Sequence, residues 1–220
     1  MKTIGLILLG AALFGQSQAL NERIYEIRNP STDSAHFRSA LEKIGEILSM
    51  QVLEELHKKE GDIQTLTGAK AKHWIVDETP VLVTILRAGL PLHAGIAKVF
   101  PNAETGFLAM SRNEETLKAG TEYIALPDLY GKTVILSDTM LATGGSMLDA
   151  IQIIEAKGAA KIFVISAIAS QPGIDRIAEY NSNIKIFVGA VDPALNDKGY
   201  IIPGLGDAGD RSFGKKGGKS

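Results

Sequence analysis

The chain has 220 residues, of which 45% are hydrophobic and 22% are charged, and its formal net charge is −2. These totals predict one globular domain with a well-buried core, and the near-neutral charge gives no reason to expect nucleic acid as a partner. Cysteine is absent, which excludes disulfides and thiolate nucleophiles, and the four histidines are not spaced as metal ligands. We therefore predict no metal site built from protein side chains.

The first nineteen residues have the features of a secretory signal peptide. Lys2 precedes an apolar stretch at residues 4–14, and the small residues Ser17 and Ala19 fit a cleavage site after Ala19. The alternative is an apolar helix that packs on the domain or on a partner subunit. We expect the folded domain to begin only near Ile24.

The pattern after Ser34 predicts a helix. Its apolar stripe, which we expect to form core or a subunit interface, has the spacing of one helix face and consists of Phe37, Leu41, Ile44 and Leu48. Residues 57–61 are predicted to be a charged loop, and residues 62–76 are weakly patterned. Within them, Trp74 is predicted to be a packing residue.

Residues 81–86 form an apolar, β-branched run that predicts a buried strand, and a helix is predicted at residues 92–99. Between them lies Arg87, followed by Ala88 and Gly89. An arginine at the carboxyl end of a strand suits oxyanion binding, because its guanidinium binds phosphate through two parallel hydrogen bonds. The alternative is a surface salt bridge.

Residues 133–146 contain the strongest local signal. An apolar strand leads through Asp138 to Thr143-Gly144-Gly145-Ser146, and apolar residues then recur at helical spacing, so a helix should begin near Ser146. A strand, a glycine loop and a helix N-terminus together can hold a phosphate, because backbone amides and the helix dipole favour an anion there. The alternative is an ordinary tight turn between strand and helix.

Further strands are predicted at residues 106–110, 161–168 and 184–188, with a helix at 175–180. Strands that alternate with helices indicate an α/β fold with a central, mostly parallel sheet flanked by helices.

The C-terminal stretch contains Gly204-x-Gly206-x-x-Gly209, which formally matches a dinucleotide-binding fingerprint. We reject that interpretation, because the fingerprint must open a helix and needs an acidic residue about twenty positions later, beyond the end of the chain. We expect residues 20–214 to form the domain, residues 1–19 a separate signal or targeting segment, and residues 215–220 a flexible tail.

Three separated motifs resemble the phosphoribosyltransferases, and the uracil phosphoribosyltransferase family in particular. Residues 138–146 are similar to the loop that binds 5-phospho-α-D-ribose 1-diphosphate (PRPP), residues 85–90 to a diphosphate-binding segment, and residues 196–210 to the uracil-binding loop. The charged segment at 111–116 resembles a mobile loop whose arginine contacts diphosphate. The resemblance departs at Thr139, where the family usually has proline, and at Pro91-Leu92, Ser111, Asn113 and Ser170-Gln171-Pro172.

The resemblance also implies roles for individual residues. The implied catalytic residues are Arg87, Arg112 and Asp138. The implied PRPP ligands are Arg87, Arg112, Asp138, Thr139, Met140, Leu141, Ala142, Thr143, Gly144, Gly145, Ser146 and Asp207. The implied uracil ligands are Ile201, Gly206, Asp207 and Ala208, on a small C-terminal base-binding hood.

The implied reaction joins uracil to PRPP and yields UMP and diphosphate, with Mg²⁺ bound mainly through PRPP and water. The resemblance further implies a homodimer or homotetramer and a GTP effector. One rival is a catalytically weak regulatory protein that binds PRPP or a nucleotide. A transferase for another base is disfavoured, because the loop at residues 201–208 is intact. Because PRPP is an intracellular metabolite, we expect a cytoplasmic protein, with export or an organelle as the alternative.

Overall fold

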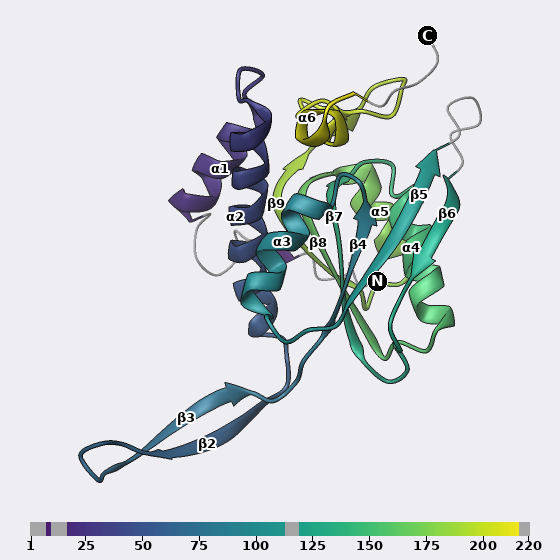
Figure 1. The fold of residues 1–220 in the computed structure, drawn as a ribbon. Helices are drawn as coiled ribbons and strands as arrows, with labels where there is room; N and C mark the ends of the chain where they lie inside the picture. The colour runs from purple at the N-terminus through teal and green to yellow at the C-terminus, as the bar shows by residue number, and fades with distance from the viewer. Residues whose placement is uncertain (1–7, 10–16, 113–118, 216–220) are drawn as a thin grey trace, which may run out of the picture.

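The computed structural model describes residues 8–9, 17–112 and 119–215 (Figure 1). Within these ranges the main sheet has the strand order β1-β9-β8-β7-β4-β5-β6. Its strands are β1 (Leu8–Leu9), β4 (Val81–Leu86), β5 (Thr105–Arg112), β6 (Ala119–Ala125), β7 (Thr133–Leu141), β8 (Lys161–Ser170) and β9 (Lys185–Asp192). Neighbouring strands are parallel except β5 and β6. The mostly parallel sheet is therefore confirmed.

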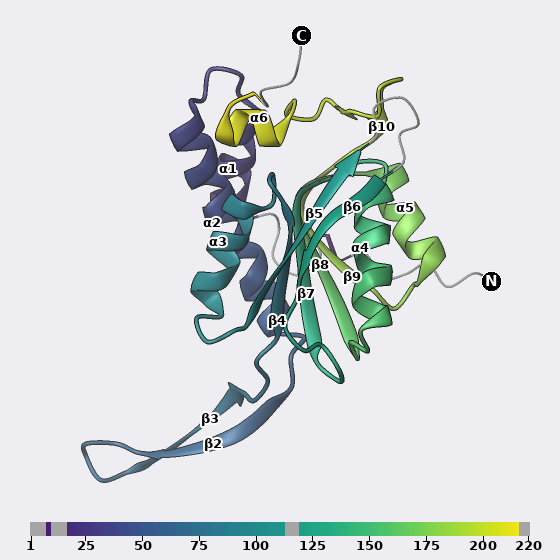
Figure 2. The same cartoon turned by 45° about the vertical axis from the view of Figure 1, so that its right-hand side comes forward.

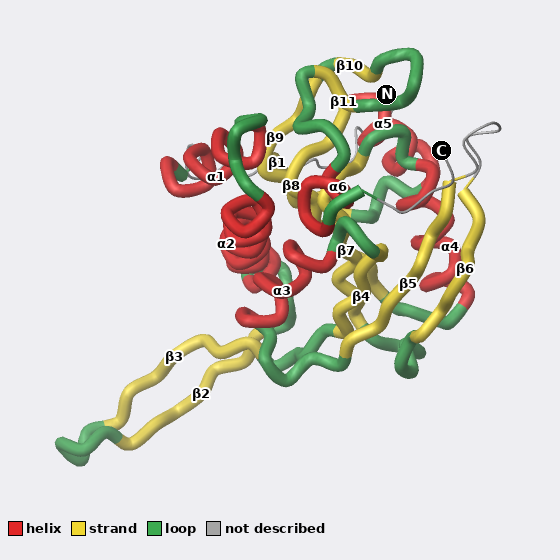
Figure 3. Tube along the Cα trace, turned by 45° about the horizontal axis from the view of Figure 1, so that its top comes forward, coloured by secondary structure: helices red, strands yellow, loops and turns green. Residues whose placement is uncertain are grey.

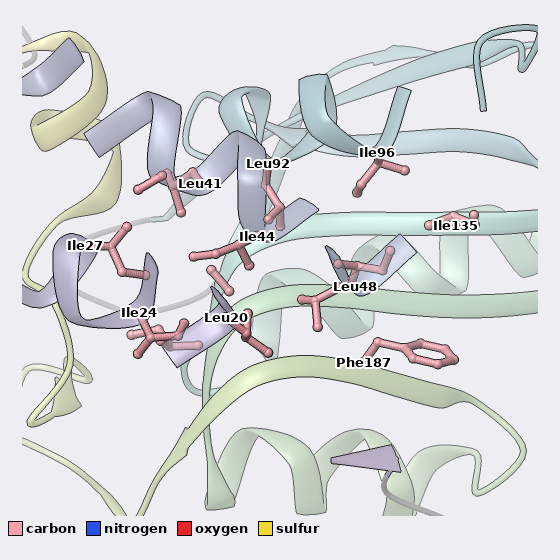
Figure 4. Close-up of a cluster of buried hydrophobic side chains, with 14 of the residues drawn as sticks. Leu20, Ile24, Ile27, Leu41, Ile44, Leu48, Leu92, Ile96, Ile135 and Phe187 are labelled. Carbon is pink, nitrogen blue, oxygen red and sulfur yellow. The ribbon is translucent and has the colours of Figure 1, made fainter. Parts of the chain in front are cut away.

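Helices cover both faces of this sheet (Figure 2). The helices on one face are α1 (Gln18–Arg28), α2 (Ser34–Leu53) and α3 (Leu90–Val99), and those on the other are α4 (Gly145–Ala156) and α5 (Gln171–Tyr180). Figure 4 shows Leu48 of α2 beside Phe187 of the sheet, and Leu41 and Ile44 belong to the same buried cluster. The predicted apolar stripe of α2 is thus core.

The order of the strands creates a switch point between β4 and β7. From β4 the chain continues to β5 on one side, whereas β7 is followed by β8 and β9 on the other. Open α/β sheets bind ligands at the carboxyl ends of the strands beside such a point. Arg87 follows β4, and Asp138 to Ser146 follow from the end of β7 into α4, so two of the predicted motifs meet there.

The prediction for residues 57–76 was wrong. They form a hairpin of β2 (Lys58–Gln64) and β3 (Lys70–Val76), paired antiparallel from Lys58↔Val76 to Gln64↔Lys70. The hairpin projects away from the sheet (Figures 1 to 3), and the side chain of Trp74 is 73% exposed rather than packed. Because both faces of the hairpin are largely exposed, its sequence lacks the apolar alternation that indicates a half-buried strand.

The folded part also begins earlier than expected. Helix α1 starts at Gln18, six residues before Ile24, and the hydroxyl of Ser17 accepts the amide of Leu20 at 3.3 Å as its cap. The side chain of Leu20 is only 1% exposed. Cleavage after Ala19 would therefore remove the cap and the first two residues of α1. Most of the predicted signal segment, residues 1–7 and 10–16, lies outside the described residues.

Leu8 and Leu9 form a short strand beside Phe187 and Val188 of β9. In the described ranges, no helix combines the length and apolar character that crossing a membrane requires.

Candidate active site

The predicted phosphate loop, residues 138–146, joins β7 to the N-terminus of α4. Gly144 has a φ of 76°, in the left-handed region that favours glycine. At Gly145, by contrast, an added Cβ would meet nothing nearer than Thr143 Oγ1 at 3.6 Å. The first amides of α4 thus lie at the carboxyl edge of the sheet, and an added Cβ at Gly145 would make only ordinary contacts with Thr143 and Arg176 Nη1, an arrangement that can receive a phosphate.

The neighbouring turn between β8 and α5 supports the phosphate loop. The hydroxyl of Ser170 donates to the carbonyl of Ala142 at 2.6 Å and accepts the amide of Gly173 at 2.9 Å. Gly173 packs so closely that an added Cβ would lie 2.3 Å from the same Ala142 carbonyl. Arg176 donates to the carbonyl of Thr143 at 3.3 Å. The departure from the family at residues 170–172 therefore includes a serine that holds the loop in place.

Asp138 has the electrostatic environment of a functional carboxyl. Burial raises its pKa to about 7, although the backbone amides of Thr139 and Met140 act to lower it. The Thr139 amide donates to its Oδ1 at 2.7 Å. Such a carboxyl ionises near neutral pH and can accept hydrogen bonds from hydroxyl groups.

Arg87 connects the switch point to the C-terminal part of the chain. The Leu86–Arg87 peptide bond is cis, and Nη2 of Arg87 lies 3.4 Å from both Asp210 Oδ1 and the Gly214 carbonyl. Its Nε is buried, and no hydrogen-bond partner for it exists among the described residues. Since leaving a buried donor unpaired is costly, this N–H marks a point at which the described residues supply no acceptor. Arg87 is therefore more than one half of a surface salt bridge.

Thr139 joins the Arg87 segment to the phosphate loop. Its side chain is fully buried, and its hydroxyl donates to the carbonyl of Ala88 at 2.6 Å. Thr139 thus connects the two motifs directly.

The predicted base-binding residues lie on what we call the C-terminal loop, residues 201–208. It begins in β11 (Ile201–Ile202), which pairs antiparallel with β10 (Ala194–Leu195), and continues through a cis Ile202–Pro203 bond into α6 (Ala208–Phe213). Gly206 has a φ of 84°, and an added Cβ there would meet nothing within 4 Å. Asp207 caps α6 by accepting the amide of Asp210 at 2.8 Å, and Ala208 is buried. The loop follows a short antiparallel strand, which supports rejecting the dinucleotide fingerprint.

The structure therefore brings together Arg87, the phosphate loop and the start of α6. Arg112 ends β5, but its side chain and residues 113–118 lie outside the described part of the structure, so its role stays a prediction. Sequence reasoning missed Arg28, Asp192 and Arg211, which hold the C-terminal loop. They are isolated charged residues far apart in the chain, and no local pattern marks them.

An α/β sheet whose switch point carries a glycine-rich helix N-terminus, a carboxyl and an arginine is the arrangement expected of the phosphoribosyltransferase class. Residues 14–215 match the family model "Uracil phosphoribosyltransferase". A uracil phosphoribosyltransferase from Aquifex aeolicus is 41% identical over 194 residues, 88% of this chain and 93% of that protein. Another, from Clostridium novyi, is 39% identical over 86% of this chain and 91% of that protein.

A solved structure of an Aquifex aeolicus protein superimposes with a TM-score of 0.83 at 40% identity, covering 89% of this chain and 94% of that one. The chain belongs to the uracil phosphoribosyltransferase family.

Proposed function

We propose that this protein transfers the phosphoribosyl group of PRPP to uracil and releases diphosphate. The observation that carries the proposal is the contact of Arg87 with Asp210, which brings the predicted base-binding segment to the predicted diphosphate arginine. Membership of the family supports the same reaction. The bond between the ribose C1 and the diphosphate oxygen breaks, diphosphate keeps the electron pair, a uracil ring nitrogen bonds to C1, and its proton is lost to water.

In this reaction the protein mainly positions and neutralises charge. Arg87 and Arg112 stabilise the departing diphosphate, and Asp138 accepts hydrogen bonds from the ribose hydroxyls. The amides at residues 142–146 bind the 5′-phosphate. Backbone groups of Ile201, Gly206 and Ala208 pair with the edge of the uracil ring, and Asp207 lies between the two substrates. This division needs no strong general base.

The residues fit a magnesium ion that arrives with PRPP. Among the described residues, no cluster of three acidic or histidine side chains could hold a metal. Mg²⁺ commonly binds through one or two carboxylates together with substrate phosphates and water, so PRPP oxygens would be its main ligands, with Asp138 as the nearby carboxyl. When bound, the ion supplies positive charge to the leaving diphosphate.

The decisive experiment incubates the purified full chain with labelled uracil, PRPP and Mg²⁺. We expect UMP, dependent on all three components, and no product when cytosine replaces uracil. Calorimetry with PRPP alone distinguishes the transferase from the alternative, a regulatory protein that binds PRPP. Tight PRPP binding without UMP formation would contradict the transferase and support the regulatory protein. Adding GTP to the same assay tests the family's effector, whose action we expect as a rise in activity.

We further propose a homodimer or homotetramer, in which the β2–β3 hairpin contributes to the contact. The apolar side chains of Ile63, Leu66, Trp74 and Ile75 are exposed on this projecting arm. Leaving these apolar side chains exposed to water costs free energy, and a second copy of the protein would cover them. Light scattering should give at least the dimer mass, and Leu66→Glu with Trp74→Lys should shift it towards the monomer. A wild-type monomer would contradict the proposal.

For location we propose the cytoplasm, because an exported enzyme would not meet PRPP. Fractionation and N-terminal sequencing of the native protein test this. An intact Met1 in the cytoplasm is expected. A mature start at Leu20 outside the cytoplasm would favour the signal-peptide interpretation.

A further inference from the structure

We propose that Arg28 and Asp192 are positioning residues that set the conformation of the C-terminal loop and thereby the affinity for uracil. This inference rests on the proposed function, since it assigns that loop to the base. The two residues come from opposite ends of the chain: Arg28 ends α1, and Asp192 ends β9. The end of helix α1 is linked to α6, because Arg211 of α6 donates to the carbonyls of Ile27 and Asn29, and Figures 1 and 3 show α6 beside the helices of this face.

Arg28 and Asp192 form a bidentate ion pair around the backbone of Gly204. Nη2 of Arg28 lies 2.6 Å from Asp192 Oδ1, and Nη1 lies 2.9 Å from Oδ2. The same Nη1 donates to the Gly204 carbonyl at 2.8 Å, and the Gly204 amide donates to Asp192 Oδ2 at 2.9 Å. Both polar backbone groups of Gly204 are therefore fixed by one pair of side chains.

Gly204 is the point at which the C-terminal loop bends. Its φ is 62°, and an added Cβ would lie 2.1 Å from the Ile201 carbonyl, so glycine is required there. The predicted base contacts, Ile201 on one side and Gly206 on the other, flank this bend. Because they would bind through backbone groups, their direction depends on how the bend is held. If the bend is misplaced, these backbone groups point in the wrong direction, and no change of side-chain rotamer can restore it.

Burial indicates why this pair is suited to positioning. Asp192 is only 4% exposed, and removing water from an ion pair offsets much of the attraction between its charges. Such a pair is a poor source of net stability. Its two parallel hydrogen bonds, however, impose a specific geometry on the groups that share them.

A second arginine docks the same loop on the same helix end. Arg211 donates to the Leu205 carbonyl at 2.9 Å and to the Asn29 carbonyl at 2.7 Å, and it also donates to the Ile27 carbonyl. Its guanidinium stacks on the ring of Phe37 at 4.2 Å. The end of α1 thus contacts the C-terminal loop through several groups, and Arg28 is the one that contacts Gly204.

The test measures three variants, Arg28→Lys, Asp192→Asn and the double variant that combines them. Arg38→Lys is the control. Arg38 is a matched control because it also links an N-terminal helix to the C-terminal region, donating to the Ser212 carbonyl at 2.6 Å, but it does not contact the C-terminal loop. We expect Arg28→Lys to raise KM for uracil at least about tenfold and to change KM for PRPP less than about twofold. Lysine keeps the positive charge, but it cannot make the two parallel hydrogen bonds of the guanidinium. Since the pair acts as a unit, the double variant should be little worse than either single one.

The outcomes separate positioning from general stability. If both KM values rise together, in step with a lower Tm, and Arg38→Lys does the same, the pair is only structural and the proposal fails. Asp192→Asn keeps the shape of the side chain, so it provides the same comparison if Arg28→Lys folds poorly.

Amide hydrogen exchange provides a readout without catalysis. In Arg28→Lys, the amides of residues 201–206 should exchange faster while those of β8 stay unchanged. If they do so in a protein that makes no UMP, the proposed function fails and the loop geometry stands. If the wild-type protein makes UMP and exchange and KM for uracil are unaltered in the variant, the positioning role is wrong and the proposed function stands.

Discussion

The phosphate loop and the C-terminal loop lie at the same edge of the sheet but are held in different ways. The phosphate loop is fixed by its own glycines and by Ser170 and Arg176, which are 28 and 33 residues away from the carbonyls they contact. The C-terminal loop is fixed by Arg28, which is 176 residues from Gly204, and by Arg211, which reaches back 182 residues to Asn29.

This difference separates the general part of the reaction from the specific part. A phosphate needs only amides and a helix N-terminus, which one strand, one turn and one helix can supply. Under the proposed function, an uncharged base is distinguished by the directions of several hydrogen bonds, and the loop assigned to it is held by packing between the two ends of the chain. We infer that the phosphate loop depends mainly on its own segment and on the neighbouring turn, whereas the proposed base recognition depends on the distant helix α1.

The largest effect should come from blocking the phosphate loop. Gly145→Val places a branched side chain in the space left for the anion, and we expect PRPP affinity to fall by about 100-fold, or ~2.7 kcal/mol. The backbone tolerates a Cβ at this position, because the nearest atoms to an added one are side-chain atoms of Thr143 and Arg176 at 3.6 and 3.7 Å. Calorimetry measures the loss. Gln152→Val, at an exposed position on the same helix, is the control, and equal affinities in the two variants would remove the loop from the PRPP site.

The sequence could predict the phosphate loop because its own elements are local, although it could not predict that Ser170 and Arg176 of the neighbouring turn hold it. The apolar strand, Asp138, the two glycines and the helical spacing are consecutive, and parallel strands place their carboxyl ends at one edge. The same logic predicted Arg87 at that edge. It could not predict that Arg28 and Asp192 surround Gly204, because neither residue belongs to a motif and their pairing exists only after the chain has folded. The hairpin was missed for a related reason, since its exposed faces leave no apolar period.

Asp138 provides the next test, through the dependence of stability on pH. The folded carboxyl has a pKa of about 7, whereas the unfolded one titrates near 3.8. Between these values the folded state holds an extra proton on Asp138, so the contribution of this carboxyl to stability is fully present below about pH 4 and is lost as the pH rises to about 7. After allowance for partial exposure, we expect wild type to lose about 2 kcal/mol between pH 5 and pH 8 relative to Asp138→Asn. Urea unfolding at both pH values measures this difference, and parallel curves for the two proteins would contradict the raised pKa.

Arg87 links the two loops, and its loss should affect the step that they share. Arg87→Ala should lower kcat/KM by at least about tenfold, or ~1.4 kcal/mol, because the leaving diphosphate loses a charged donor. Arg87→Lys should recover only part of this, since it lacks the two parallel N–H groups. Steady-state kinetics with PRPP varied provides the measurement. Arg23→Ala, an arginine on the outside of α1 whose ion pairs are local ones with Glu22 and Glu26, should behave as wild type. If Arg87→Ala matched this control, the diphosphate assignment would be wrong.

The smallest effect should come from Thr139, which joins the phosphate loop to the Arg87 segment through a single hydroxyl. Thr139→Val keeps the volume and leaves the Ala88 carbonyl without this donor, so we expect a loss of about 1 kcal/mol in stability. Because Ala88 follows Arg87 directly, the arginine should also lose its alignment, and KM for PRPP should rise about three- to fivefold. Thr139→Ser, which retains the donor, should restore most of the affinity.

The control for Thr139 is Ser137→Ala, which removes the hydroxyl that Ser137 donates to the Val83 carbonyl at 3.3 Å. This bond joins the same two strands deeper in the sheet and contacts neither loop. Ser137→Ala should therefore lower Tm without changing KM for PRPP. If both variants lowered Tm equally and neither changed KM, Thr139 would serve only the packing of β4 against β7, and the link between the two motifs would have no part in binding PRPP.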